Sequence, residues 1–193
     1  LKKININSVL FHRPSQGKIN SDINFIKFFK NEYPDVPIGI CTNSLSVYEL
    51  YRSYIDINVI QIALNPLDYL NNKLLLEKLN SDKVKIQIRS VLSSGLLSGK
   101  YNTKSVFTDI IRSKYHKSRI ADRYLKRIKT SLDVIRYVKE NYGIQKKDVP
   151  IFIYSIFESL ECAECVIRGG SSLSQIKDNC KTLFISEEIR KDF

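Results

Sequence analysis

The feature that most constrains the fold is a regular alternation of short apolar runs with amphipathic stretches. The apolar runs are typical of strands, and they cover residues 6–12, 36–41, 58–64, 84–90 and 163–169. The other stretches carry apolar residues at helical spacing, and they cover residues 21–33, 44–54, 67–80, 118–143, 148–160 and 172–183. Strands separated by helices pair in parallel through crossover connections. We therefore predict an α/β fold with five parallel strands.

The arrangement of these units favours part of a barrel over an open sheet. Five βα units are too few to close a barrel of eight. The phosphate-binding loops of open sheets are missing, because the sequence contains neither GxGxxG after the first strand nor GxxxxGK[ST]. Instead, GGSS at 169–172 follows the last strand and opens a helix, where barrels commonly hold a phosphate. We predict a partial (β/α)8 TIM barrel that forms a single domain over residues 1–193.

The chain is basic, with a formal charge of +11 over 193 residues, but its basic residues are scattered. Their one dense region is 112–129, where apolar residues at helical spacing predict an amphipathic helix that begins at Ser118 and ends near Gly143. We assign its charged residues to a solvated face: Arg123, Lys126, Arg127 and Lys129. No recognition motif accompanies this charge, so we predict no nucleic-acid partner.

Other compositional features bear on location. The sequence has no apolar stretch of the roughly 18 residues that would cross a bilayer, and its first residues, LKKININ, are unlike a secretory signal. Its four cysteines are irregularly spaced, and the single CAEC motif at 162–165 lacks a second pair, so we expect no metal site. We predict a cytoplasmic protein with no membrane partner. The absence of methionine, even at position 1, suggests a piece of a longer protein.

The first strand ends at an unusual sequence, His12-Arg13-Pro14. Pro14 lacks an amide donor and favours an extended Arg13, so the strand must stop there. His12 then lies at a carboxyl end, which is the rim where parallel α/β folds bind ligands. His12 is therefore either part of a ligand site or a core residue whose imidazole is hydrogen-bonded by a neighbouring residue.

Several segments together resemble the successive strand ends of the aldo-keto reductase family. They occur in the right order between about residue 6 and residue 189, and they read HRP, VPIGIC, VIQIALNPLD, IQIRSVLSSGLLSGKY and VIRGGSSLSQIKDN. The resemblance implies a (β/α)8 barrel that reduces aldehydes or ketones with NADPH, of which this chain supplies the fourth to eighth βα units. It thus implies an NADP-dependent oxidoreductase with a small-molecule carbonyl substrate.

The resemblance also implies residue roles. His12 matches the catalytic histidine, which hydrogen-bonds the substrate carbonyl. The positions matched to cofactor binding are Cys41, Thr42, Gln61, Arg89, Ser90, Leu92, Ser94, Lys100, Gly169, Ser171, Gln175, Asp178 and Asn179. Residues 41, 42 and 61 would hold the nicotinamide carboxamide, 89 would lie against the ring, 90–100 would surround the pyrophosphate, and 169–179 would receive the adenosine end.

This chain departs from the family pattern at some of these positions. Cys41 and Thr42 stand where serine and asparagine are common, and Cys41 either contacts the cofactor or only fills space. Gln175 stands where many members have arginine, so we expect only a modest preference for NADPH over NADH.

One catalytic element is missing from the match. The family's proton donor is a tyrosine tuned by a lysine and an aspartate, and all three precede the histidine. None of the eleven tyrosines here lies at a matching position. We therefore expect this fragment to be catalytically incomplete. The alternative is a nucleotide-binding module or pseudoenzyme; the oligomeric state and the particular substrate stay open.

Overall fold

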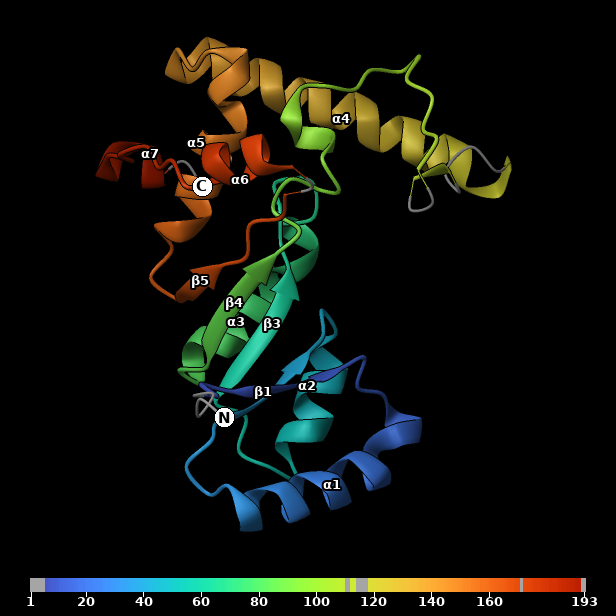
Figure 1. The fold of residues 1–193 in the computed structure, drawn as a ribbon, viewed down its shortest axis with the longest axis vertical. Coiled ribbons are helices and arrows are strands. Elements are labelled where there is room, and N and C mark those ends of the chain that lie inside the picture. The colour runs from blue at the N-terminus through green and yellow to red at the C-terminus, as the bar shows by residue number, and fades with distance from the viewer. Residues whose placement is uncertain (1–5, 110–111, 114–117, 171, 192–193) are drawn as a thin grey trace. The chain divides into compact units, whose positions relative to one another are not determined.

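The computed structural model describes residues 6–109, 112–113, 118–170 and 172–191, and it contains one sheet with helices between its strands (Figure 1). The strands are β1 (Val9–His12), β2 (Ile38–Cys41), β3 (Val59–Ala63), β4 (Lys85–Arg89) and β5 (Ala163–Val166). They lie in the order β1-β2-β3-β4-β5, and each pairs in parallel with its neighbour. The prediction of five parallel strands in sequence order is confirmed, and the architecture is that of part of an α/β barrel.

The helices follow the amphipathic stretches of the sequence. They are α1 (Ile19–Glu32), α2 (Leu45–Arg52), α3 (Lys73–Ser81), α4 (Ser118–Tyr142), α5 (Val149–Glu158), α6 (Leu173–Asn179) and α7 (Glu187–Lys191). Gly143 follows α4 with a φ of 65°, the left-handed conformation in which glycine ends many helices. The start of α3 was predicted too early, because residues 67–72 form a loop and a short 3-10 turn. The five-residue α7 was not predicted, since so short a helix carries almost no periodic signal.

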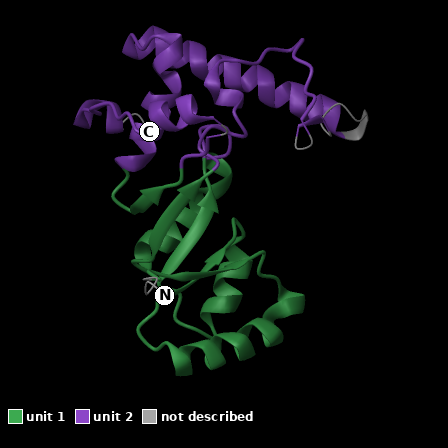
Figure 2. Ribbon diagram, viewed as in Figure 1, with its two compact units in different colours: residues 1–64, 70–89, 160–167 green, residues 65–69, 90–159, 168–193 purple. Residues whose placement is uncertain are grey.

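Contacts divide the chain into two compact units (Figure 2). The sheet unit comprises residues 1–64, 70–89 and 160–167, and it contains all the strands with α1, α2 and α3. The helical unit comprises residues 65–69, 90–159 and 168–193, and it contains α4 to α7. The single domain expected from the sequence stays a prediction.

The two faces of the sheet differ in chemistry. Alternate residues on one face are buried isoleucines at partner positions, with Ile40 beside Ile60 and Ile60 beside Ile86. Helix α1 contributes Ile23 and Ile26 to a cluster with Ile38. Because successive strand residues point to opposite faces, the second face carries the residues between these isoleucines, and several of those are polar. In the described residues, no helix is both long and apolar enough to cross a membrane.

Candidate functional site

A row of side chains crosses the second face of the sheet, from the last residues of β1 and β2 to the middle residues of β3 and β4. His12 is the register partner of Cys41, Cys41 is the partner of Gln61, and Gln61 is the partner of Gln87. Register partners in a parallel sheet share a face. The structure thus brings together three residues singled out from the sequence, His12, Cys41 and Gln61, and adds Gln87. We call these four residues the strand-end row.

Hydrogen bonds link most of this row. The Cys41 thiol donates to Gln61 Oε1 at 3.2 Å, and Gln61 Nε2 lies 3.5 Å from Gln87 Oε1. Gln87 Nε2 in turn donates to Glu164 Oε2 at 3.2 Å. A primary amide has two N–H donors and two oxygen lone pairs. The two contacts of Gln61 therefore leave one N–H and one lone pair able to pair with another carboxamide.

Cys41 acts in this row as a neutral donor. Its side chain is buried, and burial raises the pKa of the thiol, although the positive charge of Arg89 partly opposes that shift. A thiol with a raised pKa stays protonated near neutral pH and is a poor nucleophile. The residue thus positions Gln61 through a hydrogen bond and does more than fill space.

Other residues at this end of the sheet serve the backbone. Thr42 Oγ1 accepts a hydrogen bond from the Ser44 amide at 3.1 Å, which shapes the turn into α2. Asn43 Nδ2 donates to the Ala63 carbonyl at 2.8 Å, and Asn43 Oδ1 accepts from the Ala63 amide at 2.9 Å. The Asn43 side-chain amide therefore extends the pairing of β2 with β3 by one step, a role that no local sequence pattern indicates.

The segment after His12 is anchored to two helices. Tyr51 accepts from the Ser15 amide at 3.1 Å and donates to Asp22 Oδ2 at 2.6 Å. Burial and the Asp22 hydrogen bond raise the pKa of Tyr51 to about 12. The extended conformation predicted for Arg13 is wrong: its φ is 57°, in the left-handed region. His12 itself is exposed at the end of β1 and thus accessible to a ligand.

In the helical unit, the loop after β4 makes a tight turn. Ser90, Ser93, Ser94 and Gly95 all have positive φ values, between 49° and 86°. The Leu92 carbonyl accepts from the amides of Gly95 at 2.9 Å and Leu97 at 3.2 Å. Ser94 and Lys100, which the resemblance assigns to the cofactor phosphates, are exposed, so a ligand can reach them.

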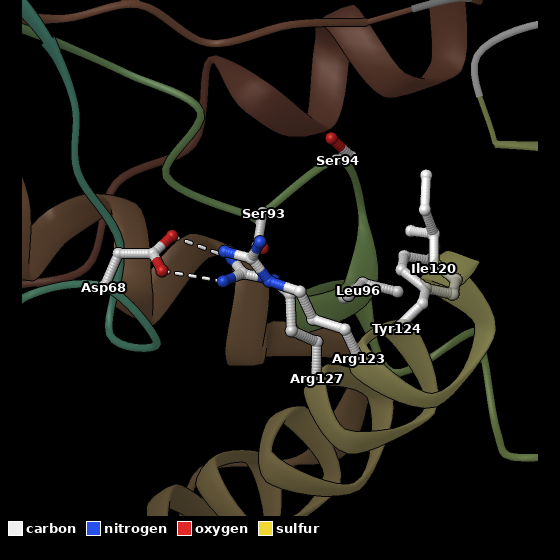
Figure 3. Close-up of a pocket in the computed structure, with 8 residues that line it drawn as sticks. All are labelled: Asp68, Ser93, Ser94, Leu96, Ile120, Arg123, Tyr124 and Arg127. Atoms are coloured by element: carbon white, nitrogen blue, oxygen red, sulfur yellow. Dashed lines mark hydrogen bonds and ion pairs between the residues drawn. The ribbon is translucent and has the colours of Figure 1, made fainter. Parts of the chain in front are cut away.

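The same loop forms one wall of a pocket of about 360 Å³ (Figure 3), which is lined by Asp68, Ser93, Ser94, Leu96, Ile120, Arg123, Tyr124 and Arg127. Arg127 donates to both Asp68 oxygens, at 2.6 and 2.8 Å, and to Ser93 Oγ at 2.6 Å. The hydrogen bonds from Arg127 hold the pKa of Asp68 below its usual value against the opposing effect of burial. The prediction that Arg127 belongs to a solvated face is wrong. Its partner Asp68 lies 59 residues away, so no local pattern identifies the pair.

The segment matched to the adenosine end is held by its own contacts. Asn179 Nδ2 donates to the Gly169 carbonyl at 2.7 Å, and the backbone N–H of Gln175 donates to Ser172 Oγ at 3.3 Å. Lys181 lies 2.7 Å from Asp178 and lowers the pKa of that carboxyl, with a smaller contribution from Lys100. Ser171, which we also assigned to the cofactor, lies outside the described residues.

Arg168 is also occupied by structural contacts. Its guanidinium bonds Glu158 at 3.0 and 2.5 Å, donates to the carbonyls of Asn179 and Lys181, and lies over the Tyr154 ring. The charge of Arg168 is therefore balanced by Glu158.

The structure defines the chain as part of an α/β barrel. Among solved structures, it is similar to the glycerol dehydrogenase AKR11B4 from Gluconobacter oxydans, with a TM-score of 0.64 and 18% sequence identity. The alignment covers 96% of this chain and 57% of that chain, so the present chain spans little more than half of that structure's length. At this identity the likeness establishes the fold. Neither the protein-family models nor the curated proteins include a match to the sequence.

Proposed function

We propose that this chain is the cofactor-binding part of an NADP-dependent oxidoreductase that reduces aldehydes or ketones to alcohols. The observation that carries the proposal is the strand-end row. In this row an exposed histidine shares one face of the sheet with Gln61, whose side-chain amide has one N–H and one oxygen lone pair left for a ligand. The barrel fold supports it, because ligands of such folds bind at the carboxyl ends of the strands.

The residues of the row fit a nicotinamide. Gln61 can donate to the carboxamide oxygen and accept from the carboxamide nitrogen, while the Cys41 thiol fixes the orientation of its side chain. Arg89 ends β4 with a planar guanidinium, which can stack on an aromatic ring. In the helical unit, Ser94 and Lys100 offer a hydroxyl and a charge to the phosphates. The cofactor, when bound, supplies the hydride.

His12 would orient the substrate. Its imidazole can donate a hydrogen bond to a carbonyl oxygen, and this polarises the carbon that accepts the hydride. Its place at the end of β1 leaves it accessible, and the Tyr51 contacts to Ser15 hold the following segment in place.

A second candidate is a nucleotide-binding module without catalytic activity. Proton transfer to the developing alkoxide requires a donor whose pKa is lowered toward neutrality. Tyr48, Tyr51 and Tyr154 all have raised pKa values, with burial as the main cause. None of these three tyrosines is therefore tuned as such a donor, and this favours a chain that binds the cofactor without catalysing the reduction.

The coding sequence upstream of Leu1 separates the two candidates. An in-frame extension of about 100 residues, with an aspartate, a tyrosine and a lysine at predicted strand ends, would complete a barrel of ordinary size and support the enzyme. A stop codon followed by a true start codon would support the binding module.

The choice between NADPH and NADH gives a further prediction. Because Arg168 is balanced by Glu158 and position 175 is glutamine, we expect the parent protein to prefer NADPH only modestly. Gln175→Arg should widen the preference by about 10-fold or more, since a guanidinium can form charge-assisted hydrogen bonds with the 2′-phosphate. Calorimetric titrations with both dinucleotides measure it.

The matched control is Ser174→Arg, which adds the same charge one residue earlier on α6 at an exposed position. We expect that control to change the preference by less than about threefold, the effect of a screened surface charge. If Gln175→Arg and Ser174→Arg widened the preference for NADPH over NADH equally, the 2′-phosphate would respond only to the overall positive charge of the region and would not be bound by residue 175.

A further inference from the structure

The pocket between Asp68, the loop after β4 and the first turns of α4 carries more positive than negative charge. We call it the arginine pocket. Its charged lining residues are Arg123, Arg127 and Asp68. Arg123 and Arg127 are four residues apart on α4, so their like charges lie on one side of the helix and repel each other. Asp68 offsets only one of them.

The two arginines differ in what they already bind. Arg127 is held by both oxygens of Asp68 and by the buried Ser93 hydroxyl. In the part of the chain that the structure describes, the Arg123 guanidinium has no hydrogen bond or ion pair, and its charge acts on Asp68 only through space. Figure 3 shows the two arginine side chains running from α4 toward Asp68 and Ser93. Arg123 is thus a cation at the pocket with unused donors.

The rest of the lining suits a tetrahedral oxyanion. Ser94 is exposed, and its hydroxyl can donate to an anion that enters the pocket. Leu96 and Tyr124 are buried and form an apolar wall, which limits solvent screening of the charges beside it. A guanidinium donates in a planar fork that matches two phosphate oxygens.

We propose that the arginine pocket binds a phosphoryl group, with Arg123 as the residue that supplies its charge-assisted hydrogen bonds. The phosphoryl group belongs either to the dinucleotide of the proposed function or to a separate phosphorylated small molecule. The proposal depends on the proposed function only in the first case. The cofactor assignment also uses the loop of Ser93, Ser94 and Leu96, but it uses neither Arg123 nor any other residue of α4.

Titration of the whole protein with inorganic pyrophosphate, followed by phosphorus NMR and calorimetry, tests this proposal. Arg123→Ala should weaken pyrophosphate binding at least 10-fold, the range for one charge-assisted contact. Arg123→Lys keeps the charge and loses the fork, so its loss should be smaller. Lys126→Ala is the matched control: it removes one exposed charge within the same helix turn, outside the pocket lining, and should change affinity less than twofold. Circular dichroism checks that each variant keeps the helix content of the parent.

Binding by the parent with selective loss in Arg123→Ala supports the pocket. Equal losses in Arg123→Ala and Lys126→Ala, or no binding by the parent at millimolar pyrophosphate, would overturn it. NADPH that displaces pyrophosphate supports the pocket with the dinucleotide as the source, whereas NADPH that binds without displacement supports it with a separate ligand. Pyrophosphate binding without any NADPH binding would remove the proposed function and leave the phosphoryl site standing.

Discussion

Replacing Gly39 with alanine should lower the free energy of unfolding by about 3 kcal/mol or more, or prevent folding altogether. Gly39 lies in the second position of β2, between its register partners Leu10 and Val59. A Cβ at this position would lie 2.2 Å from the Val59 carbonyl oxygen and 2.6 Å from Leu10 Cδ2. The carbonyl cannot move away without disturbing the pairing of β2 with β3. Urea denaturation followed by far-UV circular dichroism measures the loss.

Gly17→Ala is the control for this variant. No atom lies within 4 Å of the Cβ that it would add, so the same chemical change should alter the free energy of unfolding by less than about 1 kcal/mol. A Gly39→Ala protein as stable as Gly17→Ala would mean that β2 does not approach its neighbours as the structure describes.

Asp82→Ala should destabilise the sheet unit by about 2 kcal/mol or more, because it removes the partner of a buried hydroxyl. The Asp82 side chain is only 7% exposed and accepts hydrogen bonds from Tyr48 at 2.8 Å and Lys78 at 3.1 Å, with a third contact from Arg52. Arg52 and Lys78 are exposed enough to regain water, but Tyr48 is fully buried. Thermal or urea unfolding gives the magnitude.

The same carboxylate predicts a pH dependence. Burial would raise the pKa of Asp82, but the hydrogen bonds from Tyr48, Arg52 and Lys78 outweigh burial and lower it. A group whose pKa is lower in the folded state stabilises the fold above its unfolded pKa, near 4, and loses that contribution as the pH falls through the folded value. The parent should therefore lose stability below about pH 4 more steeply than Asp82→Ala.

Asp133→Ala serves as the comparison. Asp133 pairs with Arg136 on an exposed face of α4, where its side chain is 63% exposed. Exposed pairs contribute little, so this variant should change stability by less than about 0.5 kcal/mol. Equal losses for Asp82→Ala and Asp133→Ala would contradict the buried network.

The sheet could be predicted from the sequence because its signals are local. Ile38, Ile40, Ile60 and Ile62 fall in short apolar runs, and the stretches between those runs have helical periodicity. The meeting of His12 and Cys41 could also be predicted, since the carboxyl ends of parallel strands lie at one edge of the sheet. Gln61 is the third residue of β3, and the register of β2 with β3 places it beside Cys41. What the structure adds is the hydrogen bonding that fixes Cys41 against Gln61.

Other features could not be predicted, because their causes are distant in the sequence. In the sequence, Arg127 is one of several basic residues on an amphipathic helix, and only the fold places Asp68 beside it. In the same way, only the fold places Glu158 beside Arg168. Arg13 departs from the local preference set by Pro14, and the hydrogen bond from the Ser15 amide to the Tyr51 hydroxyl holds the segment beyond it. Local propensity thus gave way to tertiary contacts at positions close to the candidate sites.

The most direct test of the central claim is a calorimetric titration of the parent and Gln61→Leu proteins with NADPH and with 2′,5′-ADP, which lacks the nicotinamide. We predict that the parent binds both ligands, and that Gln61→Leu weakens NADPH about 10-fold, the contribution of a hydrogen-bonded amide, while 2′,5′-ADP binds unchanged. A parent that binds neither ligand at millimolar concentration, or a Gln61→Leu variant with parental affinity for NADPH, would contradict the account.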